Sequence, residues 1–206
     1  MDKITTVEQL EAFYGEVVEI AKLKEIDHIN DHYRQFIEAS PFLILATTGE
    51  KGIDCSPRGD PAGFVRVVDE KTILIPDRRG NNRLDSLRNI VGNSQVGLIF
   101  LIPNVGETIR LSGRAEILVD AELCSSFQMN NKPASCVISI VVDKIYMQCQ
   151  KALVRSKLWD PVTYIDRKTL PTAGDMAKNF AAMHGKEFDG KAYDRNYPER
   201  MKKIIY

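Results

Sequence analysis

Apolar residues along this chain change their spacing twice. Near the N-terminus and again after about residue 170 they recur every three or four positions, which is typical of helices; between Phe42 and Met147 they alternate or form short blocks, which is typical of strands. The pattern predicts helices over 7–14 and 27–39 and near 121–129 and 174–183. It predicts strands over 42–48, 53–56, 63–68, 72–76, 96–102, 107–119 and 136–147.

Hairpin-length turns separate most of these strands, which favours antiparallel pairing. The expected fold is therefore mainly β with peripheral helices (α+β): a closed or partly closed antiparallel β-barrel of six or seven strands. Residues 1–40 are expected to form N-terminal helices packing on the barrel, and residues 41–160 the barrel itself. Residues 161–206 are expected to form a C-terminal extension that ends in a loosely attached tail.

The composition of the chain narrows the possible classes of function. Lys plus Arg equals Asp plus Glu, 28 each among 206 residues, and this balance disfavours nucleic acid as a partner. There is no run of about 18 apolar residues to span a membrane and no secretory leader pattern. Four cysteines without a C-x-x-C pair indicate free thiols in a cytoplasmic protein. His28 and His32 are four residues apart but have no evident third ligand, so no metal is expected.

The segment from Ile75 to Leu87 carries the most chemical information. A strand runs into a turn that contains Arg78, Arg79 and Arg83, and the turn opens a helix with apolar positions at Leu84, Leu87 and Ile90. Free N–H groups at a helix N-terminus favour an anion, and guanidinium groups match phosphate geometry. The segment therefore predicts a phosphate cradle, and the alternative interpretation is a solvated charged turn.

Two further groups are candidates for ligand contacts. Lys151, Arg155 and Trp159 are spaced to lie along one face of a helix, where an indole offers a stacking surface and the cations offer donors. The alternative is a surface helix with one anchored Trp. Arg58, at the end of a strand, either points into a site or pairs with Asp60.

An ordered set of motifs runs through the barrel region. It comprises Ser40-Pro41-Phe42, Ser56-Pro57-Arg58-Gly59-Asp60, Pro76-Asp77-Arg78 with Gly80-Asn81 and Arg83, Arg110-Leu111-Ser112-Gly113-Arg114, and Gln150-Lys151 with Arg155-Ser156 and Leu158-Trp159. Across about residues 30–160 the chain resembles the pyridoxamine 5′-phosphate oxidase-like superfamily of FMN-binding split barrels. Within it, the chain is most similar to a bacterial branch of probable FMN-dependent enzymes.

The resemblance implies a homodimer with two FMN molecules at the subunit interface. It places the FMN phosphate against Arg78, Gly80, Asn81 and Arg83, with Arg58 adding a phosphate or ribityl contact. It places backbone groups of Pro76 and Asp77 at the isoalloxazine edge, and polar contacts to the flavin at Thr108 and Arg110. Lys151, Arg155 and Trp159 occupy the region that reaches the flavin from the partner subunit in the oxidase.

The chain departs from the oxidase where substrate would bind. The oxidase's C-terminal Arg-x-His signature is missing, and its Ser-Arg-Lys turn is replaced by residues 80–83. The expected function is an FMN-binding flavoprotein that acts as an FMN-dependent oxidoreductase on an unidentified small molecule, with a small-molecule electron donor and acceptor. Two alternatives stay open: a non-catalytic protein that stores or senses FMN, and a split barrel that uses haem or a deazaflavin.

Overall fold

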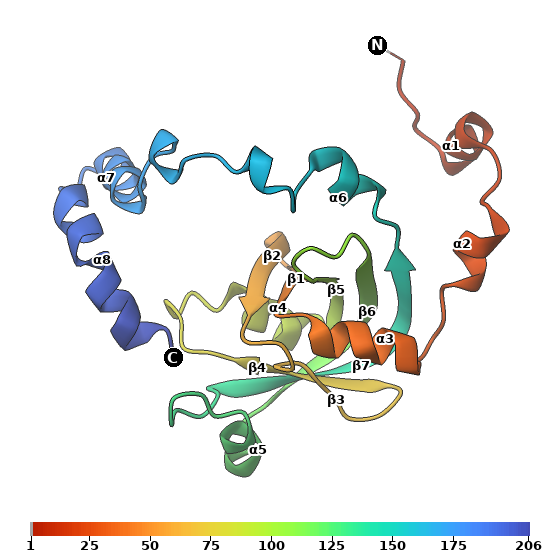
Figure 1. Ribbon diagram of the computed structural model, residues 1–206, viewed down its shortest axis with the longest axis horizontal. Helices are drawn as coiled ribbons and strands as arrows, with labels where there is room; N and C mark the ends of the chain where they lie inside the picture. The colour runs from red at the N-terminus through yellow and green to blue at the C-terminus, as the bar shows by residue number, and fades with distance from the viewer. Residues whose placement is uncertain (1) are drawn as a thin grey trace.

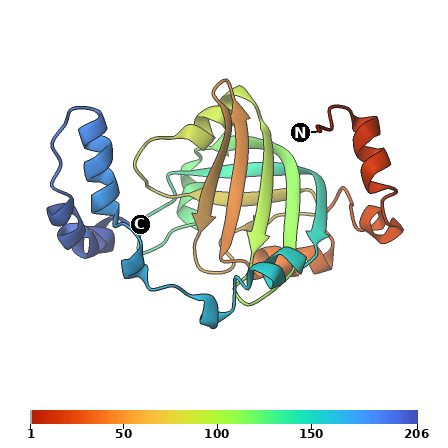
Figure 2. The same ribbon diagram turned by 90° about the horizontal axis from the view of Figure 1, so that it is seen from above.

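The computed structural model describes residues 2–206. Seven strands form one antiparallel sheet in the order β2-β1-β5-β6-β7-β4-β3, and the sheet curls into a barrel (Figures 1 and 2). The strands are β1 (Phe42–Gly49), β2 (Gly52–Gly59), β3 (Arg66–Val67), β4 (Thr72–Asp77), β5 (Gln95–Leu101), β6 (Thr108–Leu118) and β7 (Cys136–Gln148). The expected antiparallel barrel with peripheral helices is confirmed.

Alternation places one face of each strand in the core. In β1, Leu43, Leu45 and Thr47 are buried, whereas the residues between them are partly exposed. The first five residues of β7 are all buried. One of their faces lines the barrel core, and the other, through Val137, packs against Cys124 and Phe127 beside the short helix α5 (Ala121–Ser126).

A bulge bends the two longest strands. The pairing of β6 with β7 shifts register between Ser112 and Gly113. A Cβ atom at Gly113 would lie 2.2 Å from the carbonyl oxygen of Val141, so only glycine fits at this approach. The bend lets β6 and β7 pass from one side of the barrel to the other.

Two ion pairs bridge the split between strands that are not neighbours in the sheet. Arg58, on β2, pairs with Asp77, at the end of β4. Arg78, one residue beyond β4, donates from Nε to Asp60 at 2.8 Å, one residue beyond β2. We call this place the seam, defined by Arg58, Asp60, Asp77 and Arg78, because β2 and β4 stand at opposite sides of the sheet order.

Two helices pack on the barrel, and the second of them adjoins the seam. They are α3 (Asp31–Ala39) and α4 (Asp85–Gly92). The side chain of Asn89 on α4 donates to Thr47 at 3.0 Å, and a Cβ at Gly49 would collide with that same side chain. This close approach fixes where α4 begins, and therefore where the turn after β4 must run.

The N-terminal region follows the expectation only in part. Helix α1 (Val7–Tyr14) begins at the predicted cap Thr6, but neither α1 nor α2 (Glu19–Leu23) buries a residue, so the packing expected for residues 1–40 is seen for α3 alone. The helix predicted from residue 27 begins instead at Asp31, with Asn30 as its cap. Ile26 bridges to β7 and Ile29 bonds to Glu70, which holds these residues extended.

The C-terminal extension is more ordered than the predicted loose tail. After the short helix α6 (Lys151–Ser156), two 3-10 turns lead to α7 (Ala173–Met183) and α8 (Gly190–Ile204), a helical hairpin beside the barrel (Figure 2). The prediction of a loose tail missed helix α8, whose N-terminus is capped by Asp189. The two helices cross closely: a Cβ atom at Gly174 would lie 2.1 Å from the carbonyl oxygen of Gly190. Asp194 of α8 accepts a hydrogen bond from the Gly174 N–H at 2.8 Å. Glycines thus permit the close crossing of the two helices.

Within residues 2–206, none of the helices combines the length and the apolar character needed to cross a bilayer.

Candidate functional site

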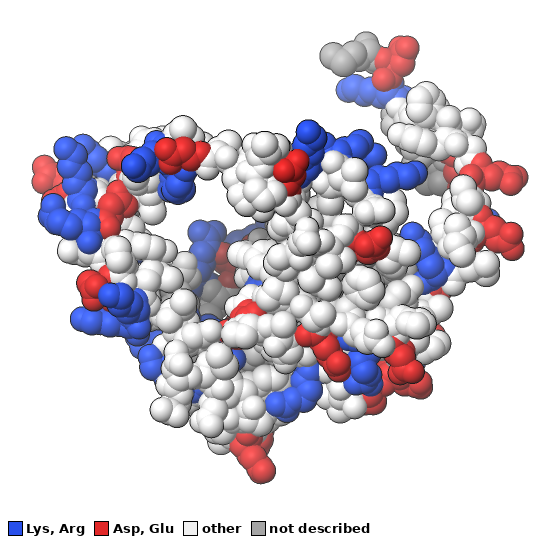
Figure 3. Space-filling model, in the orientation of Figure 1, with Lys and Arg blue, Asp and Glu red and all other residues white. Residues whose placement is uncertain are grey.

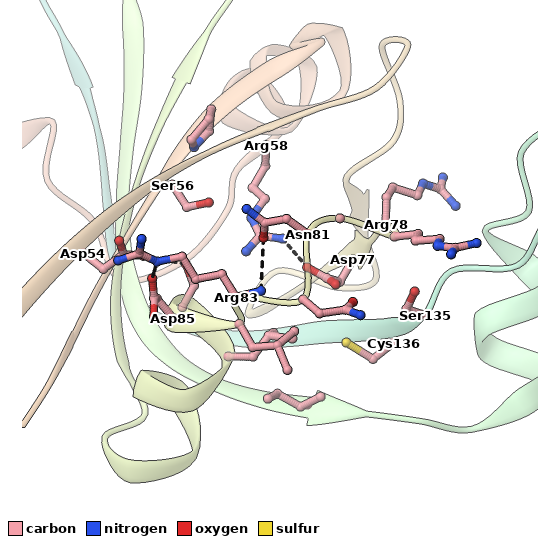
Figure 4. Close-up of a pocket in the computed structure, with 18 of the residues that line it drawn as sticks. Asp54, Ser56, Arg58, Asp77, Arg78, Asn81, Arg83, Asp85, Ser135 and Cys136 are labelled. Atoms are coloured by element: carbon pink, nitrogen blue, oxygen red, sulfur yellow. Dashed lines mark hydrogen bonds and ion pairs between the residues drawn. The ribbon is translucent and has the colours of Figure 1, made fainter. Parts of the chain in front are cut away.

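A cavity of about 670 Å³ opens at the seam (Figure 4). Its walls are β2, the turn after β4, the first turn of α4, the end of β6 and the start of β7. The volume lies within the range of roughly 300–1,000 Å³ that small-molecule and cofactor sites occupy. The cavity is therefore large enough for a nucleotide-sized ligand.

The seam pairs form one wall of this cavity. Side chains of Arg58 and Asp77 are 17% and 11% exposed, and they face one another across the barrel split (Figure 4). The Nε atom of Arg58 is buried and has no hydrogen-bond partner. The sequence left two alternatives for Arg58: it points into a site, or it pairs with Asp60. In the structure Arg58 lines the cavity and pairs with Asp77, whereas Asp60 pairs with Arg78.

The turn between β4 and α4 presents backbone donors to the same space. Asn82 and Leu84 adopt left-handed conformations, with φ of 59° and 61°, and Leu84 is the N-cap of α4 without any side-chain cap. Among the described residues nothing accepts from the N–H groups of Asp85, Ser86 and Leu87. Leu84, predicted as an apolar position within this helix, is instead its N-cap and is 45% exposed.

This uncapped N-terminus is unusual within the chain. The other helices of eight or more residues, α1, α3, α7 and α8, each have a side-chain oxygen that accepts from the first turn. An uncapped first turn leaves several N–H groups without a partner, and the helix dipole adds positive potential there. The cavity therefore contains donors arranged for an anion.

Charged side chains of both signs line the cavity. It holds four guanidinium groups, at Arg58, Arg78, Arg79 and Arg83, against three carboxylates. Arg83 is 77% exposed and pairs with Asp85, two residues along the chain. Within residues 2–206, no carboxylate lies within ion-pair distance of Arg79. The lining keeps a net positive charge.

Two cysteines also line the cavity. Burial raises the pKa of Cys136 to about 11, so its thiol stays protonated and inert. Cys55 is exposed in the same cavity. A third thiol, Cys149, lies elsewhere, and the N–H of Lys151 lowers its pKa.

The cavity brings together one group of the residues predicted from the sequence. Pro76 lies in a small hollow that adjoins it and shares Arg58 and Arg78 with it. The predicted residues in the cavity itself, which we call the seam group, are Arg58, Asp77, Arg78, Gly80, Asn81 and Arg83. A Cβ at Gly80 would meet nothing within 4 Å, so the wall is open at that point.

Sequence reasoning missed Asp54 and Ser86. The hydroxyl of Ser86, in the first turn of α4, donates to the Asp54 carboxylate at 2.8 Å, which links β2 to α4. A usable signal was the alternation along β2: Asp54, Ser56 and Arg58 occupy every second position and therefore share one face.

The remaining predicted residues do not line the cavity. We call them the distal group: Thr108, Arg110, Lys151, Arg155 and Trp159. Thr108 opens β6 and pairs with Gln148; β6 itself reaches the cavity only at Ile117, nine residues further along the strand. Arg110 lies over the ring of Tyr146, 5.1 Å from its centre.

The distal group does not form the single helical face that the spacing predicts. Helix α6 ends at Ser156, because Lys157 adopts a left-handed conformation with φ of 51°. Trp159 therefore follows the helix, and its indole N–H donates to the carbonyl oxygen of Val105 at 2.9 Å. Lys151 and Arg155 remain exposed on α6.

No group of three or more residues suited to holding a metal ion occurs in the part of the chain described, residues 2–206.

The barrel, its seam and its cavity define a split-barrel protein with a candidate anion site at the split. A family model described as pyridoxamine 5′-phosphate oxidase matches residues 29–149, more than half of the chain. The chain therefore belongs to the pyridoxamine 5′-phosphate oxidase family. A search of curated proteins finds no match.

Several solved structures are similar to the barrel region. HupZ from Group A Streptococcus is 20% identical, with 57% of this chain and 91% of that chain covered and a TM-score of 0.47. A putative pyridoxamine 5′-phosphate oxidase from Lactobacillus delbrueckii is 16% identical, with 59% and 95% covered and a TM-score of 0.46. General Stress Protein 26 from Bacillus anthracis is 17% identical, with 55% and 88% covered and a TM-score of 0.44.

Proposed function

We propose that the protein is an FMN-binding flavoprotein and an FMN-dependent oxidoreductase that acts on a small molecule, with FMN at the interface of a homodimer. Family membership supports a flavin nucleotide as the ligand class. The observation that carries the proposal is the uncapped N-terminus of α4 inside a cavity lined by four arginines.

The residues present fit a phosphate monoester. The free N–H groups of Asp85, Ser86 and Leu87 offer short hydrogen bonds to phosphate oxygens, as helix N-termini commonly do. Arg58 has a buried Nε without a partner in the same cavity, so a ligand oxygen there would satisfy it. Each paired guanidinium keeps further N–H donors, because one carboxylate engages only part of the fork.

The two faces of the sheet support a second copy of the chain as the partner. Arg58 is in register, through Leu43 and Phe100, with Ile109 on the face that lines the core, whereas Arg110 lies on the opposite face of β6 over the ring of Tyr146. Groups on opposite faces of the sheet would contact one FMN if the distal group came from another chain. A symmetric dimer repeats such a contact twice and so forms two equivalent sites.

The chain's own residues have separable tasks in this proposal. FMN, when bound, supplies the redox chemistry, and the protein supplies position and electrostatics. The seam group holds the phosphate, and the backbone of Pro76 and Asp77 orients the ring edge. Lys151 or Arg155 of a partner subunit would place a positive charge near the ring, and Trp159 a stacking surface.

Binding is tested by titrating the purified apoprotein with FMN and with riboflavin while flavin fluorescence is recorded. We expect FMN to bind at least about tenfold more tightly, because riboflavin lacks the phosphate that the charged donors engage. Equal affinities would contradict the phosphate assignment. Anaerobic bleaching of the bound flavin by NADH or NADPH supports an oxidoreductase, and a flavin that every donor leaves oxidised supports storage or sensing.

The shared site is tested by mixing two variants. Arg83→Ala damages the seam group and Arg155→Ala the distal group, so each homodimer has two impaired sites. After subunit exchange, a site shared between chains regains wild-type FMN affinity in about a quarter of all sites, since half of the dimers are mixed and each has one intact site. If each chain binds FMN alone and without the distal group, Arg155→Ala binds FMN as wild type does before mixing, and mixing adds no further high-affinity sites. The matched control mixes Arg83→Ala with Arg78→Ala. Both substitutions damage the seam group, so no site in any dimer of this mixture is intact.

A further inference from the structure

A second, smaller cavity adjoins the first at its phosphate end. It has a volume of about 170 Å³ and shares Arg78, Arg79 and Ser135 with the larger cavity. Its other walls are Lys132, Pro133 and Tyr206, so the C-terminal extension closes it on one side. Figure 1 places the end of the chain beside the turn that follows β4, and Figure 3 shows positive side chains within the hollow between the C-terminal arm and the barrel.

Contacts to both walls hold Tyr206 in this place. The ammonium group of Lys132 donates to the carbonyl oxygen of Tyr206, and the guanidinium of Arg78 lies 5.8 Å from the centre of its ring. The nearby Asp60 carboxylate, as a hydrogen-bond acceptor, raises the pKa of the Tyr206 phenol, so the hydroxyl stays protonated. The ring and Pro133 supply the apolar part of the wall.

Positive charge in this cavity exceeds negative charge. Arg79 has no carboxylate within ion-pair distance among residues 2–206, in contrast to Arg58, Arg78 and Arg83, whereas Lys132 already donates to the main-chain oxygen of Tyr206. No carboxylate side chain lines the smaller cavity. The unpaired guanidinium of Arg79, the remaining N–H donors of Lys132 and the Ser135 hydroxyl, next to a phosphate site, are suited to a second phosphoryl group.

We propose that Arg79, Lys132 and Ser135, under the ring of Tyr206, form a subsite for a second phosphoryl group, so that the combined site accepts the pyrophosphate of a dinucleotide. This inference rests on the proposed function, because it takes the larger cavity as the site of the flavin phosphate. The shared chemistry is a pyrophosphate. One source is FAD, which carries it on the flavin; the other is a nicotinamide dinucleotide bound beside FMN.

Two titrations separate these sources. In the first, wild type, Arg79→Ala and Lys132→Ala apoproteins are titrated with FMN and with FAD by fluorescence. In the second, the FMN-loaded proteins are titrated with ADP, a pyrophosphate probe without a flavin, by calorimetry. Lys22→Ala serves as the matched control, because Lys22 is an exposed and unpaired lysine of α2 outside both cavities. Circular dichroism of every variant confirms that it is folded.

We expect each subsite variant to weaken FAD or ADP binding by about tenfold to a hundredfold, the usual effect of deleting a charged hydrogen bond. FMN affinity should change by less than about threefold in Lys132→Ala; Arg79 also lines the larger cavity, so for Arg79→Ala the expected result is that FAD or ADP binding falls further than FMN binding. Selective loss of FAD binding identifies FAD as the source, and selective loss of ADP binding to the FMN-loaded protein identifies a separate dinucleotide. If FAD and ADP bind the variants as they bind wild type, or if FMN weakens equally, the subsite does not exist.

The proposed function fails on a different observation, namely that wild type does not bind FMN. ADP binding to apoprotein then still tests the subsite, because that measurement needs no flavin. Tyr206→Ala gives a further readout: it removes the ring but leaves the three polar groups, and we expect dinucleotide binding to fall while FMN binding is retained.

Discussion

Replacing Arg83 by alanine separates an effect on ligand binding from an effect on stability. Its side chain is 77% exposed, and its one ion pair, with Asp85, is on the surface. Exposed ion pairs contribute little to stability, and substitutions at such positions usually change the free energy of unfolding by no more than about 0.5 kcal/mol. We therefore expect the thermal midpoint of the apoprotein to stay nearly unchanged.

The same substitution should weaken FMN binding clearly. A hydrogen bond to a charged group contributes about 1.5–3 kcal/mol, which corresponds to a loss of about ten- to a hundredfold in affinity. Riboflavin has no phosphate, so its weaker binding should be the same in wild type and variant. The quantity to measure is thus the difference between two affinity ratios, which removes any general effect of the substitution on the cavity.

Fluorescence titration of wild type and Arg83→Ala with both flavins gives this difference directly. Arg88→Ala is the control, since Arg88 is an exposed arginine of the same helix that does not line the cavity. Raising the salt concentration should weaken FMN binding more in wild type than in the variant, because screening acts on the contact that the variant lacks. Unchanged FMN affinity, or an equal loss for riboflavin, would refute a phosphate contact at Arg83.

Three further substitutions or reactions probe the seam and the distal group. Arg58→Ala should lower the free energy of unfolding by about 3–5 kcal/mol, because it leaves Asp77 buried without its partner; denaturant unfolding measures this, and Arg58→Ala with Asp77→Asn should recover part of the loss. Bound FMN should slow alkylation of Cys55, which is exposed in the cavity, whereas Cys136, with its pKa raised to about 11, should react slowly in both states; equal rates for Cys55 with and without FMN would place the ligand elsewhere. Trp159→Ala should alter the flavin spectrum or potential more than the thermal midpoint, and an unchanged spectrum and potential would put Trp159 outside the site.

Much of the barrel could be predicted because the apolar alternation along β1, β5 and β6, and the apolar block that opens β7, are themselves the physical cause of their burial. The limits of β2 were harder to predict. Its residues alternate between exposed and partly buried positions, but this alternation is not matched by one of apolar and polar residues. The apolar pattern therefore indicated an end near Ser56, whereas the strand extends to Gly59. Helix α8 was missed for a related reason: its order comes from the Asp189 cap and the crossing at Gly174, not from a strong apolar face.

The partners of the arginines could not be read from the chain. Arg58 and Asp60 are two residues apart in the chain and were natural partners by sequence. Closure of the barrel instead brings β2 beside the end of β4, where Asp77 is available to Arg58 and Asp60 to Arg78. The anion-ready turn was predictable because strand, arginines and helix are consecutive, whereas the return of Tyr206 to this turn depends on the fold of the whole extension.

The seam carboxylates have a cost and a benefit for the proposed phosphate site. Each one lowers the positive potential that a phosphate would meet, but four guanidinium groups in one cavity would repel one another strongly without them. Asp60 and Asp77 also fix the orientation of Arg78 and Arg58 before a ligand arrives, which reduces the conformational entropy lost on binding. The same two ion pairs bridge strands that share no backbone hydrogen bonds. Barrel closure and the arrangement of the anion site therefore rest on the same contacts, so a change that strengthens phosphate binding by removing a seam carboxylate should also weaken the barrel.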